Sequence, residues 1–290
     1  MLNLEQITRL VCQVAREAGT YIRKEREGFS TDQVERKHAH DYVSYVDKGS
    51  ERLIVSRLRE ILSEAGFITE EGTTKSEGDG PTADASSINH HPSDFTWVVD
   101  PLDGTTNFIH GFAPYAVSIA LICGHELLVG VVYEIVGDEC FYAWAGGGAY
   151  VEAGGLKCEG RNERLQVGNS DINDALLCFQ LPYNSEAYKP VIKQFIDRFY
   201  GNVGSIRMLG SAAIALCYVA AGRLDGYAER YIGQWDFMAG ALIVREAGGM
   251  VTNYTGQSDF VGGDSILATN GRIHQELLQA TLQVAALPNC

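Results

Sequence analysis

Long apolar runs are missing from this sequence. Within its 290 residues no stretch approaches the roughly 20 apolar residues that a membrane-spanning helix needs. The first residues, MLNLEQITRLVCQ, also lack the basic segment, apolar stretch and small-residue cleavage site of a secretory signal. We therefore expect a cytoplasmic protein with no membrane partner.

Paired cysteines are missing as well. The seven cysteines are odd in number and scattered along the chain, and no two of them have C-x-x-C spacing. This pattern indicates neither a zinc site nor a disulfide framework. We expect most of the cysteines to be reduced and structural.

Runs of basic residues are absent too. Lys and Arg number 23 against 37 Asp and Glu, which gives a formal net charge of −14. Such a chain repels nucleic acid and anionic membrane surfaces, so we expect neither as a partner. An excess of carboxylates is compatible with a divalent-cation site, although composition alone does not establish one.

Two segments of the first half, 4–22 and about 48–65, have apolar residues at helical spacing. The segments FITEE and TWVVD predict short strands, and the polar stretch between them predicts a surface loop. YAVSIALIC, ELLVGVVYEIV and ECFYAWAG are rich in β-branched and aromatic residues and are separated by GH and GD. They predict an antiparallel meander.

The second half alternates strands with helices, which indicates helices packed on a mixed or parallel sheet. The expected strands are ALLCFQL, SIRML, LDGYAE, MVTNY and SILATN. The expected helices are about 187–199, SAAIALCYVAAG, DFMAGALIVREAGG and 272–285. No Pro/Ser-rich linker divides the chain, so we expect one α+β domain over 1–290, with approximate halves 1–160 and 161–290.

The stretch WVVDPLDGTTNF carries the densest chemistry. Asp100 and Asp103 follow an apolar run, and they could direct both carboxylates and the Leu102 carbonyl toward one point. Oxygen ligands of this kind suit Mg²⁺. Gly-Thr-Thr at 104–106 then offers backbone N–H groups at the start of a short helix, a natural anion site. The alternative is an ordinary Asp-Pro and Asp-Gly turn.

Other acids stand at the ends of short elements. Glu70 and Glu71 end the segment FITEE, where they fit solvated loop acids as well as ligands. Asp236 begins the helix DFMAGALIVREAGG, where it fits an N-cap as well as a ligand. Spacing along the chain does not show whether these acids converge with Asp100 and Asp103.

The motifs EEG, WVVDPLDGTTNF and WDFMAGALIVREAGG, in that order, resemble those of the inositol monophosphatase family. These enzymes are Mg²⁺-dependent, lithium-sensitive phosphatases, and their superfamily includes fructose-1,6-bisphosphatase. The similarity extends from the first helix through DYVSYVDKGSE, GSAAIALCYVAAG and YAERYIGQWD to ILATN. It implies a layered αβαβα sandwich of the sugar phosphatase type, usually assembled as a homodimer.

The resemblance also implies roles for individual residues. It implies two or three Mg²⁺ ions, held by Glu70, Asp100, the Leu102 carbonyl, Asp103 and Asp236. The catalytic residues that it implies are Glu70, Asp100 and Thr105, because Thr105 matches a threonine whose hydroxyl, with Glu70, orients the attacking water.

Substrate contacts are implied by the same motifs. The matching residues are Asp103, Gly104, Thr105, Gly210, Ser211, Ala212, Glu229 and Asp236. From the residues alone, Ser211 also fits a helix N-cap, and Glu229 a solvated acid at a strand end. Lys37 and Asp47 match a pair that helps hold a further metal or its waters, with Arg36 competing for the lysine role.

The activity that the resemblance implies is hydrolysis of a small polyol phosphate monoester by a metal-activated water. Myo-inositol 1-phosphate is the first candidate, because Thr106 stands where a lysine would indicate nucleotide 3′-phosphate hydrolysis. Fructose 1,6-bisphosphate, histidinol phosphate and other sugar phosphates stay open as substrates. A hypothesis of another class is a regulatory interaction protein with residual phosphatase activity.

Overall fold

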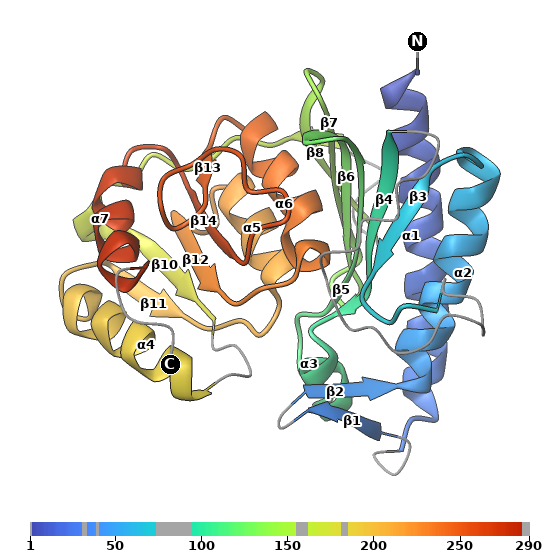
Figure 1. Ribbon diagram of the computed structural model, residues 1–290, viewed down its shortest axis with the longest axis horizontal. Helices are drawn as coiled ribbons and strands as arrows, with labels where there is room; N and C mark the ends of the chain where they lie inside the picture. Colours follow the sequence, from blue (N-terminus) through green and yellow to red (C-terminus); the bar gives the residue numbers. More distant parts are fainter. Residues whose placement is uncertain are drawn as a thin grey trace.

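Two large β-sheets alternate with three layers of helices in the described part of the chain (Figure 1). The computed structural model describes residues 2–30, 34–38, 41–73, 94–154, 162–180 and 185–285, with backbone alone for 36–38, 41–42, 185–188 and 283–285. The layered αβαβα architecture expected from the resemblance is confirmed.

The larger sheet has seven strands in the order β3-β4-β5-β6-β7-β8-β9. Only the β3–β4 pair is parallel, so the predicted antiparallel meander is confirmed. The strands are β3 (Gly66–Thr69), β4 (Phe95–Asp103), β5 (Ala116–Cys123), β6 (Glu126–Glu134), β7 (Glu139–Trp144), β8 (Gly148–Ala153) and β9 (Asn162–Arg164).

The smaller sheet has five strands in the order β11-β10-β12-β14-β13. Strand β10 runs parallel to both neighbours, whereas β14 is antiparallel to both of its own, so of the two predicted alternatives, a mixed or a parallel sheet, the sheet is mixed. The strands are β10 (Leu176–Phe179), β11 (Ser205–Arg207), β12 (Gly226–Arg230), β13 (Met250–Thr252) and β14 (Ser265–Thr269).

The helices form an outer layer on each side and a layer between the sheets (Figure 1). They are α1 (Leu4–Glu27), α2 (Tyr45–Ile61), α3 (Thr105–His110), α4 (Ser185–Phe199), α5 (Ala212–Ala220), α6 (Gln234–Glu246) and α7 (His274–Ala285), with a 3₁₀ turn at Ile172–Asp174. Helices α1 and α2 cover the larger sheet, α4 and α7 lie beyond the smaller one, and α5 and α6 lie between the two. No described helix has the length and apolar character to cross a bilayer.

Two local features differ from the prediction. A hairpin of β1 (Val34–His38) and β2 (Asp41–Ser44) precedes α2, and its polar sequence carries no alternating signal. Helix α2 begins at Tyr45, before the predicted start near Lys48, because a capping box ends the strand there. The Ser44 hydroxyl accepts the Val46 N–H at 3.1 Å, and the Asp47 carboxylate accepts the Ser44 N–H at 2.8 Å.

Alternation along β4 separates two hydrophobic cores. Trp97 and Val99 pack in the core beneath α1 and α2, whereas Val98 packs in the central core with α5 and α6. A third core joins the smaller sheet to α4 and α7. The five cysteines among the described residues are free thiols, as expected.

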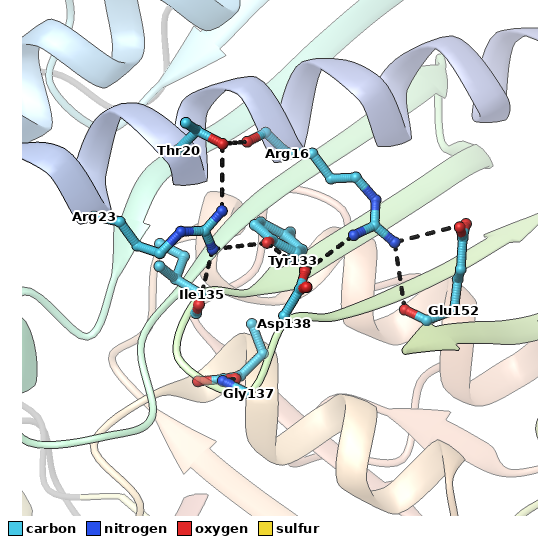
Figure 2. A network of polar contacts seen from close by, with 9 residues as sticks. Arg16, Thr20, Arg23, Tyr133, Ile135, Gly137, Asp138 and Glu152 are labelled. Atoms are coloured by element: carbon cyan, nitrogen blue, oxygen red, sulfur yellow. Dashed lines mark hydrogen bonds and ion pairs between the residues drawn. The ribbon is translucent and has the colours of Figure 1, made fainter. Parts of the chain in front are cut away.

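Helix α1 is tied to the larger sheet by a polar network (Figure 2). Arg23 donates to the hydroxyl of Tyr133 at 2.8 Å, and that hydroxyl donates to Asp138 at 2.6 Å. Arg16 donates to the same Asp138 oxygen at 3.1 Å. Tyr133 is therefore a buried tyrosine with a structural role on the α1 side of the sheet.

Candidate active site

A bulge in β4 brings the two aspartates of the DPLD motif to one side. Asp100 pairs with Ser118 and Asp103 pairs with Ala116, so three steps along β4 oppose two along β5. In a regular strand, residues three apart point to opposite faces. The extra residue of a bulge cancels that alternation, so Asp100 and Asp103 face the same site.

Asp103 is held by the N-terminus of α5. Its carboxylate accepts the Ser211 hydroxyl and the backbone N–H groups of Ala212 at 3.2 Å and Ala213 at 3.0 Å. The first N–H groups of a helix have no partner within the helix and carry partial positive charge. This contact joins the larger sheet to the central helix layer.

Asp236 reaches the same point from the start of α6. It is the third residue of that helix, and its Oδ2 accepts the Gly233 N–H at 2.9 Å, so it caps the helix from within the first turn. One oxygen from each of Asp100, Asp103 and Asp236 lies within 4.8 Å of the others.

Burial is the largest influence on the pKa of each of these acids. It raises the pKa of Asp103 to about 6, although the Ser211 hydroxyl and the α5 amides oppose the shift. Burial and then Asp103 raise the pKa of Asp236 to about 8. Burial and the charges of Glu70, Asp236 and Asp103 raise the pKa of Asp100 well above its usual range. Such a cluster favours a shared proton or a bound cation.

Glu70 is positioned by the loop that follows β3. Its N–H donates to the Val99 carbonyl at 3.2 Å, which keeps it beside β4. Glu51, a fully buried residue of α2, holds the next residues of the loop. Its carboxylate accepts the N–H groups of Glu71 and Thr73, both at 2.7 Å, and the Thr73 hydroxyl at 2.6 Å. The start of this loop is therefore anchored to α2.

Thr105 lies between two acceptors. Its hydroxyl oxygen is 2.9 Å from Oδ1 of Asp47 and 3.0 Å from the Leu102 carbonyl oxygen. Since a hydroxyl has one proton and two lone pairs, its lone pairs remain for a further donor. Asp47 is fully buried, and burial raises its pKa although the hydrogen bonds from Ser44 and Thr105 oppose the shift.

A cavity of about 430 Å³ contains these acids. The residues that line it are Glu70, Asp100, Leu102, Asp103, Gly104, Thr105, Thr106, Asn107, Gln180, Gly210, Ala212, Glu229, Tyr231, Ile232, Gly233, Trp235 and Asp236. The backbone at Gly104 has φ +87°, which glycine adopts freely, and a Cβ there would lie 3.1 Å from the Gly210 carbonyl. Two segments about a hundred residues apart thus meet at the cavity wall.

Comparison with known proteins identifies the family of this chain. A sequence model of the inositol monophosphatase family matches residues 3–286. The chain belongs to the inositol monophosphatase family. Membership supports a phosphatase, a hydrolase that acts on a small phosphorylated substrate, as the resemblance implied.

Relatives within the inositol monophosphatase family carry two kinds of name. The chain is 35% identical over 270 residues to "Nus factor SuhB" of Pasteurella multocida, covering 93% of each chain. It is 33% identical over 272 residues to "Inositol-1-monophosphatase" of Mesorhizobium japonicum, covering 93% of this chain and 94% of the relative. The solved IMPase of Thermotoga maritima has a TM-score of 0.78 and 29% identity, with coverage of 94% and 96%.

The donor set of this member of the inositol monophosphatase family fits Mg²⁺. Mg²⁺ prefers carboxylate and carbonyl oxygens. Asp100, Asp103 and Asp236 supply clustered carboxylates, and Glu70 and Leu102 line the same cavity. Burial and neighbouring carboxylates raise the pKa values of Asp100 and Asp236, and a bound cation would favour the charged forms of both. The acidic cluster is thus suited to a metal ion.

Most of the residues predicted for the site line the cavity, but Ser211 and Asp47 do not. Ser211 caps α5 with its hydroxyl, which accepts the Ile214 N–H at 3.3 Å and donates to Asp103. Its contact with substrate stays a prediction. Asp47 lies behind Thr105, and whether it helps to hold a metal also stays a prediction. The side chains of Lys37 and Arg36 lie outside the described residues, and so does most of the loop at 73–94.

Three residues of the site carried no recognised signal in the sequence. Glu51 stands four residues after Asp47 on α2, within the segment DYVSYVDKGSE. Asn107 donates to the carbonyls of Pro114 and Leu209, both at 2.8 Å, and so fixes the cavity wall. Gln180 follows β10 and accepts the Gly210 N–H at 3.1 Å. In the sequence, only their position within a motif or directly after a strand could have indicated that they belong to the site.

Proposed function

We propose that this protein hydrolyses a small polyol phosphate monoester in the presence of Mg²⁺, with myo-inositol 1-phosphate as the first candidate. The products would be myo-inositol and phosphate. The observation that carries the proposal is one cavity that holds the Asp100, Asp103 and Asp236 cluster together with Thr105 and Glu229. The name of the Mesorhizobium relative supports the choice of substrate.

We propose that Glu70, Asp100, the Leu102 carbonyl, Asp103 and Asp236 hold the Mg²⁺ ions. Bound Mg²⁺ supplies charge neutralisation of the phosphate and acidification of water. Asp103 is suited to this role because α5 and Ser211 hold its carboxylate rigidly. Asp100 is fixed in a similar way by the Leu102 N–H, which donates to it at 2.9 Å.

The proposed attack is in line, by a water oriented by Thr105 and Glu70. Because Asp47 and the Leu102 carbonyl are both acceptors, the Thr105 hydroxyl directs its own proton toward one of them. A lone pair of its oxygen then accepts a hydrogen bond from the water. Asp47 would hold Thr105 in this orientation, and the Glu70 carboxylate would take the water's proton.

The remaining groups bind the substrate. Backbone N–H groups at 104–106 would hold phosphate oxygens at the start of α3. The leaving oxygen would take its proton from a water near Asp236. Gly210, Ala212 and Glu229 line the cavity and would contact the hydroxyls of the leaving alcohol. Ser211 would add a backbone contact.

The first test is phosphate release by the purified protein with Mg²⁺ or with EDTA. The substrates are myo-inositol 1-phosphate, fructose 1,6-bisphosphate, histidinol phosphate and 3′-phosphoadenosine 5′-phosphate. We expect Mg²⁺-dependent release with preference for the inositol ester. Preference for another ester would replace the substrate while keeping the chemistry. No release from any ester, with Mg²⁺ bound, would refute the proposal.

A second candidate is a role as a Nus factor, the name carried by the Pasteurella relative. The charge of −14 argues against direct binding to nucleic acid, so such a role would rest on contacts with protein. An Asp100→Asn variant separates the candidates, because it should abolish hydrolysis and leave a protein–protein role intact. We also propose a homodimer, by analogy with the family, which sedimentation would test.

A further inference from the structure

We propose that Tyr227 is a positioning residue that orients the Glu229 carboxylate toward a hydroxyl of the leaving alcohol. The inference rests on the proposed function and extends it to a residue that carries no signal in the motifs. The hydroxyl of Tyr227 donates a hydrogen bond to Oε2 of Glu229. Tyr227 is fully buried, so its ring does not itself reach solvent or substrate.

The two residues are held on a rigid support. They lie two apart on β12, so their side chains leave the same face of the sheet. Strand β12 is the middle strand of the smaller sheet, and Tyr227 pairs with Cys178 of β10 and Ala268 of β14. A donor on such a strand has little freedom to follow a displaced partner.

Glu229 needs such a donor. It is 8% exposed and lines the cavity, and its burial, followed by the charge of Asp103, opposes its ionisation. The side chain of a glutamate can otherwise rotate about several bonds. The hydrogen bond from Tyr227 stabilises the charged carboxylate and selects one orientation for it.

The geometry has a consequence for substrate choice. Tyr227 engages Oε2, so a substrate hydroxyl would be bound through Oε1. An alcohol with a hydroxyl in the matching place gains a hydrogen bond to a fixed carboxyl oxygen, whereas one without it gains nothing. Tyr227 would therefore favour hydrolysis of polyol esters and have no effect on hydrolysis of esters whose alcohol lacks that hydroxyl.

The test is Tyr227→Phe, which removes only the hydroxyl. It is assayed with Mg²⁺ on myo-inositol 1-phosphate and on 4-nitrophenyl phosphate, whose leaving group has no further hydroxyl. We expect kcat/KM for the inositol ester to fall about tenfold, chiefly through KM, because about one hydrogen bond between Glu229 and the substrate is lost. For the nitrophenyl ester we expect a change of less than about twofold, because that ester never uses the hydrogen bond.

Tyr133→Phe is the matched control. Its hydroxyl also donates to a carboxylate, that of Asp138 at 2.6 Å, and it is 1% exposed, but it lies in the α1 network (Figure 2). It should lower the melting temperature as Tyr227→Phe does, and leave kcat/KM unchanged for both esters. Glu229→Gln should lower kcat/KM for the inositol ester selectively. Adding Tyr227→Phe to Glu229→Gln should lower it little further.

Two outcomes would overturn the inference. If the unaltered protein is active and Tyr227→Phe changes kcat/KM for both esters alike, or for neither ester, Tyr227 has no positioning role. Inactivity of the unaltered protein on both esters would overturn the proposed function and the inference with it. If Tyr227→Phe melts below the assay temperature, all variants are assayed at a temperature below its melting point. The same selective loss is expected there, and an equal loss on both esters would contradict the inference.

Discussion

Asp47 receives hydrogen bonds from the N–H and hydroxyl of Ser44 and from the Thr105 hydroxyl, while it is wholly shielded from water. The same carboxylate therefore caps α2 and contacts the residue that we propose orients the attacking water. A buried carboxylate without such donors would be costly. Folding and the proposed chemistry thus depend on one side chain.

Thr105→Ala tests the role of this hydroxyl. We expect kcat to fall about a hundredfold or more, since a positioned proton-transfer group contributes about 10²–10⁴. The rise in melting temperature with Mg²⁺ should remain, because the carboxylates are intact. Thr105→Ser, which keeps the hydroxyl, should retain most of the activity. A near-normal kcat in Thr105→Ala would show that the assignment is wrong.

Asp100→Asn tests the proposed cation site. Removing one carboxylate from the cluster should weaken Mg²⁺ binding and reduce hydrolysis with it. A ligand at 100 times its Kd stabilises a protein by about 2.7 kcal/mol, so the unaltered protein should melt at a higher temperature in Mg²⁺. The variant should show little of this rise. An equal rise in both proteins would place the ion elsewhere.

At the scale of elements, the site depends on how helices hold loops. Helix α2 carries Glu51, which binds two backbone N–H groups and a hydroxyl just after Glu70. A loop alone would lose much more conformational entropy when it places a ligand. Anchoring this loop to a helix in advance lowers that cost when the ion binds.

Glu51→Gln tests the anchor. The amide NH₂ is a donor, so it cannot replace a carboxylate oxygen that accepts from an N–H, and one buried group loses its partner. We expect stability to fall by about 1–3 kcal/mol and Mg²⁺ to bind more weakly. Urea unfolding and Mg²⁺ titration measure the two effects. Glu60→Gln, on the exposed side of α2, is the control and should change neither.

Helix α7 begins at a buried histidine. The ring of His274 lies between two threonine hydroxyls: Oγ1 of Thr252 is 3.1 Å from Nε2, and Oγ1 of Thr269 is 3.0 Å from Nδ1. Burial lowers the pKa of His274 from 6.5 to about 4. The folded state thus binds fewer protons than the unfolded state between these values. Stability from this group is fully present above about pH 6.5 and is lost as the pH falls toward 4.

The pH dependence of unfolding checks this assignment. Lowering the pH from 7 to 4 should reduce the stability by up to about 3 kcal/mol through His274, at 1.36 kcal/mol for each pKa unit. His274→Asn removes the titrating ring, so its stability should fall by correspondingly less over the same range. Parallel curves for the two proteins, measured by urea unfolding, would contradict the assignment.

At the scale of the whole molecule, α6 packs against both sheets and carries Asp236 at its start. Its approach to the larger sheet depends on Gly130 of β6, where a Cβ would lie 2.5 Å from the Ala239 carbonyl oxygen. A side chain at this position would push the central helix layer away from β6. The close contact therefore helps to fix where Asp236 stands relative to Asp100.

Gly130→Ala should destabilise the protein by about 1–3 kcal/mol, because the new methyl group overlaps backbone that cannot move alone. Gly28→Ala is the control, since nothing lies within 4 Å of a Cβ built at Gly28. Thermal unfolding of both variants measures the difference. Equal melting temperatures would show that α6 can shift at no cost.

Periodicity and motifs are local properties of the chain, so they were enough to predict the kinds of element and to single out the acids. It did not predict the β1–β2 hairpin, whose polar residues do not alternate, or the extra residue in β4. Nor could spacing decide between a cap and a ligand for Asp236, since both need an acid at the start of a helix.

The convergence of the acids, by contrast, follows from contacts between distant parts of the chain. The contact from Ser211 to Asp103 spans 108 residues, and that from Thr105 to Asp47 spans 58. Both depend on the packing of helices against sheets, which arises from the burial of apolar faces far apart in sequence. The raised pKa values follow from that burial as well, because a carboxylate responds to the dielectric and the charges around it in space.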